Sequence, residues 1–509
     1  MRMGTSSQKS NGWHALSGRS ALAFLLYFSC FIPLSAFGHE RDKRPADIDS
    51  TICPEEASRL LSAYIQYPSV TGNEKPAGEF FSGLCRERGL NVKVFTDAPD
   101  SYNFAASLYP FQSGKPNIIL LSHIDVVSES DLSEWREGPF SGAIIEDTIW
   151  GRGTIDMKGM AIMQLLAISA YVQKAQESDL PVNVTLLGVS GEENYGTMGA
   201  RIICDSFLRE LNPVVVLGEG GVGSRDILTK SKERPVFCIS VSDKRALWVE
   251  LHIDFPTSGH GSVPPPEYAN KMMINALSSL THLKPKIYFN SQTRDMFRAY
   301  GAMEKGLTGF MIKHPVIFKP LISIKVRRDP LLLATVTNTM TVTHFDGQDY
   351  DINQVPQESS VVLDCRLLPG TMTAEFLDFL HSEINNSEVE IRVLRETQHA
   401  PATVPDMFLP ILEEAVKETY PGSGMMTILF PATTDNNYFR NRGIPVYGLN
   451  PVIMDQELMK TVHNYNERIP VECLTRGTEV YMRFIGKLLS DPQDLLHVIS
   501  EDHPGFPDR

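Results

Sequence analysis

The chain has 509 residues, a formal net charge of −14, and a composition that is 42% hydrophobic and 21% charged. This length exceeds the usual range of a single domain and supplies apolar residues for more than one core, so we expect two folded domains and a leader. The acidic balance, with no run of lysine and arginine after the leader, argues against nucleic-acid binding, because phosphate contacts need a basic face.

The first residues have the pattern of a targeting segment. Basic residues precede an apolar run from Ala21 to Phe37, which ends with small residues near Ser35–Ala36. This order predicts a secretory signal over residues 1–38, which would place the protein outside the cell, in a periplasm or in a lumen. The alternative is a retained membrane anchor, since the run approaches the length of a spanning helix.

The cysteines do not form a metal-binding pattern. None belongs to a CxxC pair, so a cysteine zinc site is not expected. Buried thiols are the favoured interpretation, and disulfides are the alternative. The seven positions are Cys30, Cys53, Cys85, Cys204, Cys238, Cys365 and Cys473.

Residues 54–87 are predicted to be helical, with a break near Tyr67-Pro68. Beyond them, short apolar runs alternate with longer amphipathic ones. This alternation predicts an α/β domain whose mixed, mostly parallel sheet is covered by helices. We expect this catalytic domain over residues 52–245 and again over 397–490. Its clearest predicted strands are 117–122, 182–189 and 214–217, and its predicted helices are 157–173, 199–211, 407–419 and 474–489.

The pattern changes near residue 246. The order strand, helix, strand, strand, helix, strand predicts a ferredoxin-like unit inserted over 246–396. An extra stretch lies between about 287 and 330, and the tail 491–509 is expected to be loose. The predicted strands are 246–255, 340–345, 359–367 and 388–394, and the predicted helices are 270–283 and 374–384.

Acidic residues and one histidine gather near the ends of the predicted strands of the first half. In an open α/β sheet, ligands bind outside the carboxyl ends of the strands. Carboxylates crowded there would repel one another unless a cation lay between them. The sequence therefore predicts a site for one or two divalent metals, built from His123, Asp125, Asp156, Glu192, Glu193 and Glu219.

The spacing of these residues along the sequence predicts a different role for each member of two pairs. His123 and Asp125 are two positions apart at a strand end, which suits a metal-binding imidazole oriented by a carboxylate. Glu192 and Glu193 are adjacent and cannot point the same way. We expect one to bind metal and the other to take a proton from metal-bound water.

The wording of the motifs resembles the M20 family of metallopeptidases. The resemblance covers roughly residues 55–489, and the nearest branch is that of carboxypeptidase S and the PM20D1-like proteins, with N-acyl-amino-acid and aminoacylase-like hydrolases. It implies a two-zinc catalytic domain and an inserted lid or dimerisation domain through which a homodimer forms. The segments are HIDVV, GPFSG, WGRGTIDMKG, SGEENYGTMGA, EGG, TSGHGS and HNYNERIP.

The resemblance also implies a role for each site residue. Glu192 matches the catalytic base and Asp125 the carboxylate that orients a metal ligand. Gly218 stands where the branch commonly has Asp, which leaves Glu219 as the candidate ligand at that step. The implied metal ligands are His123, Asp156 as the bridge between two ions, Glu193, Glu219 and His463.

Three further residues are implied to contact the substrate. His260, in SGHGS, resembles a lid histidine that polarises the scissile carbonyl, often across a dimer interface. Arg366 and Asn338 occupy places where the family binds a carboxylate or an oxyanion. For Arg366 the alternative is a surface arginine at a strand end beside Asp364.

The implied reaction is hydrolysis of an amide or peptide bond beside a free carboxylate, as in an M20 carboxypeptidase or dipeptidase. The alternative is an N-acyl-amino-acid amidohydrolase, which could also run in the direction of synthesis. Apolar residues within 310–322 could line a fatty-acyl channel or belong to a core or interface. Cobalt or manganese could replace zinc in a site of this composition. An inactive binding protein on the same fold is a remote alternative, because every expected catalytic position is filled.

Two short motifs suggest other functions, dinucleotide binding and serine hydrolysis, but each lacks a required feature. Residues 218–223 (GEGGVG) satisfy a dinucleotide-binding pattern, but the text that follows lacks the apolar stripe of the helix such a site needs. Residues 188–192 (GVSGE) differ by one residue from the GxSxG motif that carries the nucleophile of serine hydrolases. Because Glu192 stands where the motif has its last Gly, this motif is not assigned.

Overall fold

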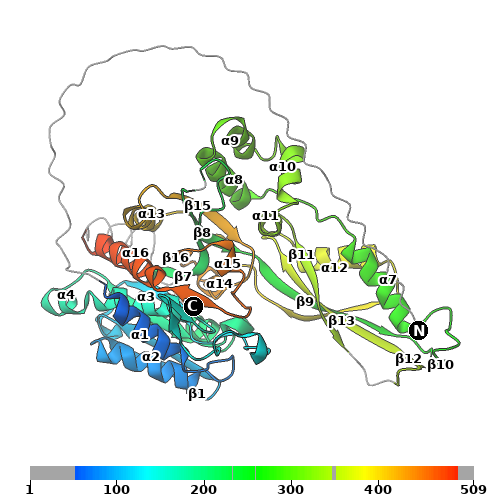
Figure 1. The fold of residues 1–509 in the computed structure, drawn as a ribbon, viewed down its shortest axis with the longest axis horizontal. Coiled ribbons are helices and arrows are strands. Elements are labelled where there is room, and N and C mark those ends of the chain that lie inside the picture. Colours follow the sequence, from blue (N-terminus) through cyan, green and yellow to red (C-terminus); the bar gives the residue numbers. More distant parts are fainter. Residues whose placement is uncertain (1–51, 232, 258, 347–350, 491–509) are drawn as a thin grey trace, which may run out of the picture. The chain divides into compact units, whose positions relative to one another are not determined.

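The computed structural model describes residues 52–490, apart from 232, 258 and 347–350 (Figure 1). The predicted signal at 1–38 and the predicted tail at 491–509 lie outside the described residues. Among the helices of the described part, none combines the length and the apolar character needed to cross a membrane.

An eight-stranded mixed sheet forms the larger layer (Figure 1). Its central pairs, β3–β6, β3–β7 and β7–β16, are parallel, and β15 pairs with β8 in parallel at one edge. Antiparallel pairs occur at β1–β2, β2–β6 and β16–β8. In spatial order the strands are β1 (Asn91–Ala98), β2 (Ser101–Ser107), β6 (Asn183–Val189), β3 (Asn117–His123), β7 (Pro213–Ser224), β16 (Val446–Ile453), β8 (Val236–Asp243) and β15 (Gly424–Phe430).

Both faces of this sheet are buried, which explains the continuous apolar text of its strands. On β3, Ile118 and Leu120 join one core cluster, whereas Ile119 and Leu121 join the cluster on the opposite side. The first cluster is covered by α1 (Pro54–Ile65), α2 (Lys75–Glu87), α3 (Lys158–Ser169), α13 (Phe408–Thr419) and α16 (Val471–Ser490). The second is covered by α5 (Ala200–Ser206), α6 (Leu208–Leu211) and α14 (Asn436–Arg440).

A separate antiparallel sheet, here called the lid sheet, has the strand order β11-β13-β9-β14. With its two helices it follows the predicted ferredoxin-like order, and the helices share one apolar core with the sheet. The elements are β9 (Arg245–Asp254), α7 (Ala269–Thr281), β11 (Thr339–Asp346), β13 (Glu358–Leu367), α12 (Thr373–Ile384) and β14 (Glu390–Glu396). The fold class predicted from the sequence is therefore confirmed, while the domain boundaries stay predictions.

Four helices, here called the helical insert, occupy the stretch that the sequence analysis left without assigned elements. Asn290 caps the first helix and Asp329 the last, each accepting a hydrogen bond from a backbone N–H of the first turn. The inner faces of the helices pack with Val236 of β8 and with Met426 and Ile428 of β15. The helices are α8 (Ser291–Met303), α9 (Gly306–Lys313), α10 (Lys319–Val326) and α11 (Pro330–Val336).

The remaining elements are short. They comprise the sheets β17-β5-β4 and β10-β12, two short α-helices and three turns of 3-10 helix. Their bounds are β4 (Ile144–Ile145), β5 (Thr148–Trp150), β17 (Arg468–Pro470), β10 (Gly259–His260), β12 (Gln354–Val355), α4 (Val172–Glu177), α15 (Gln456–Met459), η1 (Phe111–Ser113), η2 (Leu132–Glu134) and η3 (Glu192–Asn194).

Two expectations are settled by these elements. Residues 218–223 lie inside β7, which runs on to Ser224, so the third predicted strand was too short and no helix follows the glycine run. The six described cysteines are free, in agreement with the favoured interpretation of unpaired thiols. Cys30 lies outside the described residues.

Candidate metal centre

His123 is the last residue of β3, and its buried ring is held from the backbone. Its Nδ1 lies 2.9 Å from the carbonyl oxygen of Asp125, an atom that can only accept a hydrogen bond. Nδ1–H therefore donates to this carbonyl. Nε2 lies 3.1 Å from Asp156 Oδ1 and 3.8 Å from Glu219 Oε2. The ring nitrogen suited to a metal thus faces two carboxylates.

The carboxylate of Asp125 holds the turn that follows β6. Its Oδ1 accepts the backbone N–H of Glu192 and its Oδ2 that of Glu193, each at 3.1 Å. The hydroxyl of Thr71 donates to Oδ2 at 2.9 Å. The nearest carboxylate oxygen is 3.5 Å from His123 Nδ1, so the carbonyl makes the shorter contact with the imidazole. Asp125 therefore positions the histidine and both glutamates.

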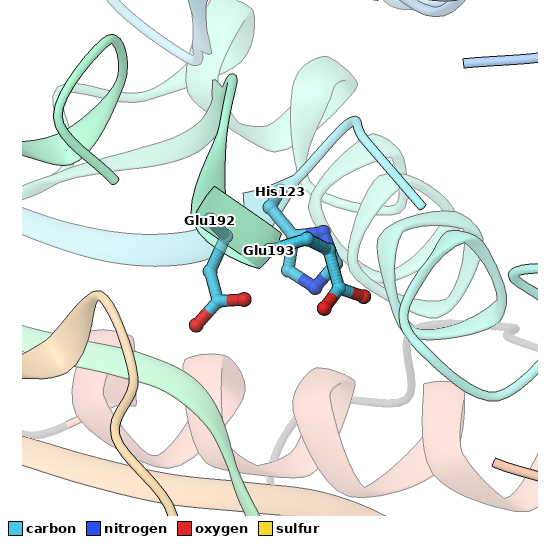
Figure 2. Close-up of side chains that lie close together, drawn as sticks. All are labelled: His123, Glu192 and Glu193. Carbon is cyan, nitrogen blue, oxygen red and sulfur yellow. The ribbon is translucent and has the colours of Figure 1, made fainter. Parts of the chain in front are cut away.

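Glu192 and Glu193 begin the short turn η3, and Figure 2 shows their carboxyl groups set apart beside His123. This agrees with the expectation that adjacent residues at a strand end point in different directions. One oxygen of each nevertheless lies within 4.8 Å of a ring nitrogen of His123 and of the other. Both carboxyl groups can therefore act at the same centre.

Asp156 lies between two histidines. Its Oδ1 is 3.1 Å from His123 Nε2, and its Oδ2 is 3.1 Å from His463 Nε2. His463 Nε2 also lies 3.1 Å from Glu193 Oε1. Three groups of residues each bring one ligand atom per residue within 4.8 Å of the others. They are His123–Asp156–Glu219, Asp156–Glu193–His463 and His123–Glu192–Glu193.

The backbone that carries Asp156 is fixed by Glu467, which the sequence analysis missed. Glu467 Oε1 accepts the backbone N–H groups of Ile155 and Asp156 at 2.8 and 3.1 Å, and Oε2 accepts that of Gly153 at 3.0 Å. Arg152 pairs with the same carboxylate at 2.8 Å, and both side chains are no more than 2% exposed. The only sequence signal for this role was the place of Glu467 in the HNYNER segment.

The pKa values show how strongly the carboxylates compete for positive charge. Burial and then Asp156 raise the pKa of Glu219 to about 8, and burial followed by Glu219 raises the pKa of Glu192 well above its usual range. Burial opposes ionisation of Asp156, but its hydrogen bonds to the two histidines outweigh burial and lower its pKa. Hydrogen bonds to Asp156 and Glu193 raise the pKa of His463 to about 10. Protons bound to Glu219 and His463 reduce the negative charge of the cluster, as divalent cations would.

A small cavity beside these residues brings in Asp435, which the sequence analysis also missed. It is lined by Leu121, His123, Met157, Glu192, Glu219, Asp435 and Asn436. Burial raises the pKa of Asp435 to about 8, and its Oδ2 has no hydrogen-bond partner among the described residues. The side-chain amide of Asn436 donates to the carbonyl of Glu219 at 2.8 Å and fixes that ligand's backbone.

The three residues predicted to contact the substrate form no hydrogen bond with the predicted metal ligands among the described residues. His260 is exposed on β10, where Nδ1 contacts Ser262 at 2.7 Å and Nε2 contacts Asn353 at 3.1 Å. Arg366, on β13, donates to both carboxylate oxygens of Asp364 at 2.8 and 2.9 Å.

Asn338 lies between the helical insert and β11. Its Oδ1 accepts the backbone N–H of Leu368 at 2.7 Å and the hydroxyl of Thr371 at 3.2 Å. The structure thus brings together the predicted metal ligands, Asp125 and Glu192. It places His260 on β10, Arg366 on β13 and Asn338 directly before β11. The lid sheet with α7, α12, β10 and β12 is here called the lid elements.

Residues 119–487 match the family described as Peptidase family M20/M25/M40. This chain belongs to the M20 peptidase family. It is accordingly a hydrolase that acts on amide bonds, and use of a divalent metal is the usual property of the family.

The chain is similar to two curated relatives along most of its length. It is 28% identical over 484 residues to the N-fatty-acyl-amino acid synthase/hydrolase PM20D1 of Homo sapiens, covering 90% of this chain and 93% of the relative. It is 26% identical over 380 residues to the probable carboxypeptidase S-like 2 of Dictyostelium discoideum, covering 74% and 72%.

Among solved structures, the M20 family metallo-carboxypeptidase Sso-CP2 from Sulfolobus solfataricus has the same fold. The TM-score is 0.62 at 19% identity, over 85% of this chain and 98% of that one.

Substituting Arg152 by Met should destabilise the protein by about 3–5 kcal/mol, because the carboxylate of Glu467 would stay buried without its counter-charge. Urea unfolding followed by circular dichroism measures this loss. Arg136→Met is the matched control, since the Arg136 side chain is 62% exposed and its nearest carboxylate oxygen, on Glu137, is 3.7 Å away. Equal unfolding of Arg152→Met and wild type would contradict the assigned role of the buried pair.

Removing metal should make stability depend on pH between 6.5 and 8. The pKa of Glu219 rises from its ordinary 4.5 to about 8 and that of His463 from 6.5 to about 10, so these two groups bind more protons in the folded metal-free protein than in the unfolded chain in this window. Raising the pH therefore removes the stability that these two groups contribute. Burial lowers the pKa of Lys158 and of Lys244 to about 7, which acts in the opposite direction with or without metal, so the comparison with zinc isolates the metal site. Thermal unfolding of chelator-treated protein at pH 6.5 and pH 8, with and without added zinc, measures the effect. We expect zinc to raise the midpoint more at pH 8, and an equal or smaller gain there would refute this account.

Proposed function

We propose that the protein is a two-zinc hydrolase that cleaves an amide or peptide bond beside a free carboxylate. The observation that carries the proposal is the position of Asp156, with one carboxylate oxygen facing each of two histidines. A carboxylate shared in this way suits two cations held side by side. The raised pKa values of Glu192, Glu193 and Glu219 support the same conclusion, because these groups lack sufficient positive charge around them.

The donor set fits zinc, which binds imidazole nitrogen and carboxylate oxygen. His123, Asp156 and Glu219 would hold one ion. Asp156, Glu193 and His463 would hold the other. When bound, zinc lowers the pKa of a coordinated water and polarises a carbonyl group. Cobalt or manganese would suit the same donors.

Glu192 is proposed as the proton carrier. Glu192 lines the cavity with His123 and Glu219, and its backbone begins the turn that follows β6. It would take a proton from the attacking water and return it to the leaving nitrogen. Asp125 keeps Glu192 in place through the backbone N–H that it accepts.

Recognition of the substrate's carboxylate is proposed for Arg366 and Asn338. One edge of the Arg366 guanidinium is occupied by Asp364, while Nη1 faces the hydroxyl of Thr433 at 3.4 Å. That second edge is the one able to bind a carboxylate. His260 is proposed to polarise the scissile carbonyl of a partner subunit, which requires the homodimer through the lid elements. Its exposure and its contacts with Ser262 and Asn353 agree with a role outside its own subunit's metal centre.

The acyl side of the substrate separates two candidates. A dipeptide or a C-terminal residue is the substrate expected of a carboxypeptidase or dipeptidase. An N-acyl amino acid is favoured by the similarity to the human N-fatty-acyl-amino acid synthase/hydrolase, which spans 90% of this chain. Secretion through the segment 1–38 is proposed for either candidate.

Substituting Glu192 by Gln should lower the hydrolysis rate by more than about 100-fold, since the proton acceptor is lost. Metal analysis of the same preparation should still find about two ions per chain, because the proposed ligands are intact. Glu375→Gln, on the exposed start of α12, is the matched control and should keep full activity. Full activity of Glu192→Gln would show that another group is the base.

A substrate panel on the metal-loaded protein tests the bond and the carboxylate together. We expect hydrolysis of a dipeptide or of the N-acetyl or N-oleoyl form of the same amino acid. We expect a rate about 10- to 100-fold lower when the carboxylate is converted to an amide, since charge-assisted hydrogen bonds are lost. Preference for N-oleoyl over the dipeptide selects the amidohydrolase. Equal rates for acid and amide would disprove carboxylate recognition, and hydrolysis of nothing on the panel would overturn the proposed function.

A further inference from the structure

The outer side of the helical insert, here called the insert face, carries large apolar side chains in solvent. The inner side belongs to a core with β8 and β15. On the outer side six apolar residues are between 53% and 73% exposed: Leu307, Phe310, Val316, Ile317, Leu321 and Ile324. Scattered exposed apolar residues need no explanation, but a cluster of this kind marks an interaction site.

The exposed apolar residues belong to two short helices and the linker between them. Leu307 and Phe310 are one turn apart on α9, and Leu321 and Ile324 are one turn apart on α10. The ring of Phe310 lies 5.8 Å from that of Phe318, the residue that precedes α10. Val316 and Ile317 fill the linker between them. Figure 1 shows α9 and α10 grouped with α8, the helix that packs on β15.

The segment from residue 305 to residue 336 carries mainly positive charge. Six exposed cations accompany the apolar residues: Lys305, Lys313, Lys319, Lys325, Arg327 and Arg328. Between residues 305 and 336 the sequence holds one carboxylate, Asp329, whose Oδ1 is engaged in capping α11. This segment is therefore cationic in a chain whose net charge is −14, and on α8 the exposed Asp295 is paired with Arg298.

We infer that the insert face docks on an anionic lipid surface. Apolar side chains on an amphipathic element enter the boundary between head groups and acyl chains, while lysine and arginine contact the phosphates. A second copy of the chain fits less well, because a two-fold contact through this face would bring two sets of cations together. The inference stands on the insert face alone and holds whatever bond the metal centre cleaves.

Flotation of the full-length protein with 100 nm vesicles tests the inference. Vesicles of phosphatidylcholine alone are compared with vesicles that contain phosphatidylserine at about a third of the lipid. We expect at least tenfold tighter binding to the anionic vesicles, and this difference should shrink as salt is raised. Binding to neither kind of vesicle, or equal binding to both, would overturn the inference. Every variant retains the apolar segment at residues 21–37, so its contribution cancels between variants.

Two variants separate the apolar and the charged contributions. Leu307→Ser, Phe310→Ser, Ile317→Ser and Leu321→Ser combined should weaken binding to the anionic vesicles at least tenfold. Lys313→Glu, Arg327→Glu and Arg328→Glu combined should remove the preference for anionic lipid. The control replaces exposed apolar residues elsewhere by serine, at Val263, Ile352 and Val404, and should bind as wild type does.

Two further measurements keep the result unambiguous. Thermal unfolding shows whether each variant is folded. If the apolar variant is not, the charge variant decides the question alone. Light scattering after size exclusion gives the oligomeric state. A change from dimer to monomer in the apolar variant, with vesicle binding unchanged, would assign the insert face to a subunit contact and reject the lipid surface.

Discussion

Mutual repulsion among carboxylates at the carboxyl ends of the strands is the constraint on which the site depends. Asp125, Asp156, Glu192, Glu193 and Glu219 are drawn from four separate segments, and the parallel strands at the centre of the sheet direct these segments to one edge. Burial, and after it the neighbouring carboxylates, raise the pKa values of Glu192 and Glu219, so positive charge placed between these groups is favourable. Affinity for cations is therefore built into the fold.

Two buried carboxylates outside the three candidate ligand groups hold the backbone around this cluster. Asp125 accepts two backbone N–H groups from the turn that carries Glu192, and Glu467 accepts three from the segment that carries Asp156. Each anchor is a carboxylate bonded to the main chain, so it fixes the position of the backbone as well as that of a side chain. Arg152 supplies the counter-charge to the carboxylate of Glu467.

The sequence predicted those features that depend on residues close together in the chain. Period and apolar runs predicted β3, β6 and the ferredoxin-like order of the lid sheet, because burial of both faces or of one face determines those patterns. Residues at strand ends, such as His123 and Glu192, could be proposed from the same reasoning. His463 could be proposed only by resemblance, and Glu467 and Asp435 were missed.

These three residues contact partners that lie hundreds of residues away in the sequence. A short sequence pattern cannot indicate such a long-range contact. The helices of the insert were missed for another reason. The apolar residues of α9, α10 and α11 face both inward and outward, so these three helices show no single stripe.

The unpaired thiols have a consequence for how the protein can be made and handled. Burial raises the pKa of Cys238, Cys365 and Cys473 to about 12, which leaves almost no thiolate to exchange with other sulfur groups. All six cysteines of the described residues are free, so reactivity at these sites depends on burial and exposure. Cys53, exposed just before α1, is the accessible thiol among the described residues, and it offers one defined point for attaching a fluorophore or a surface tether.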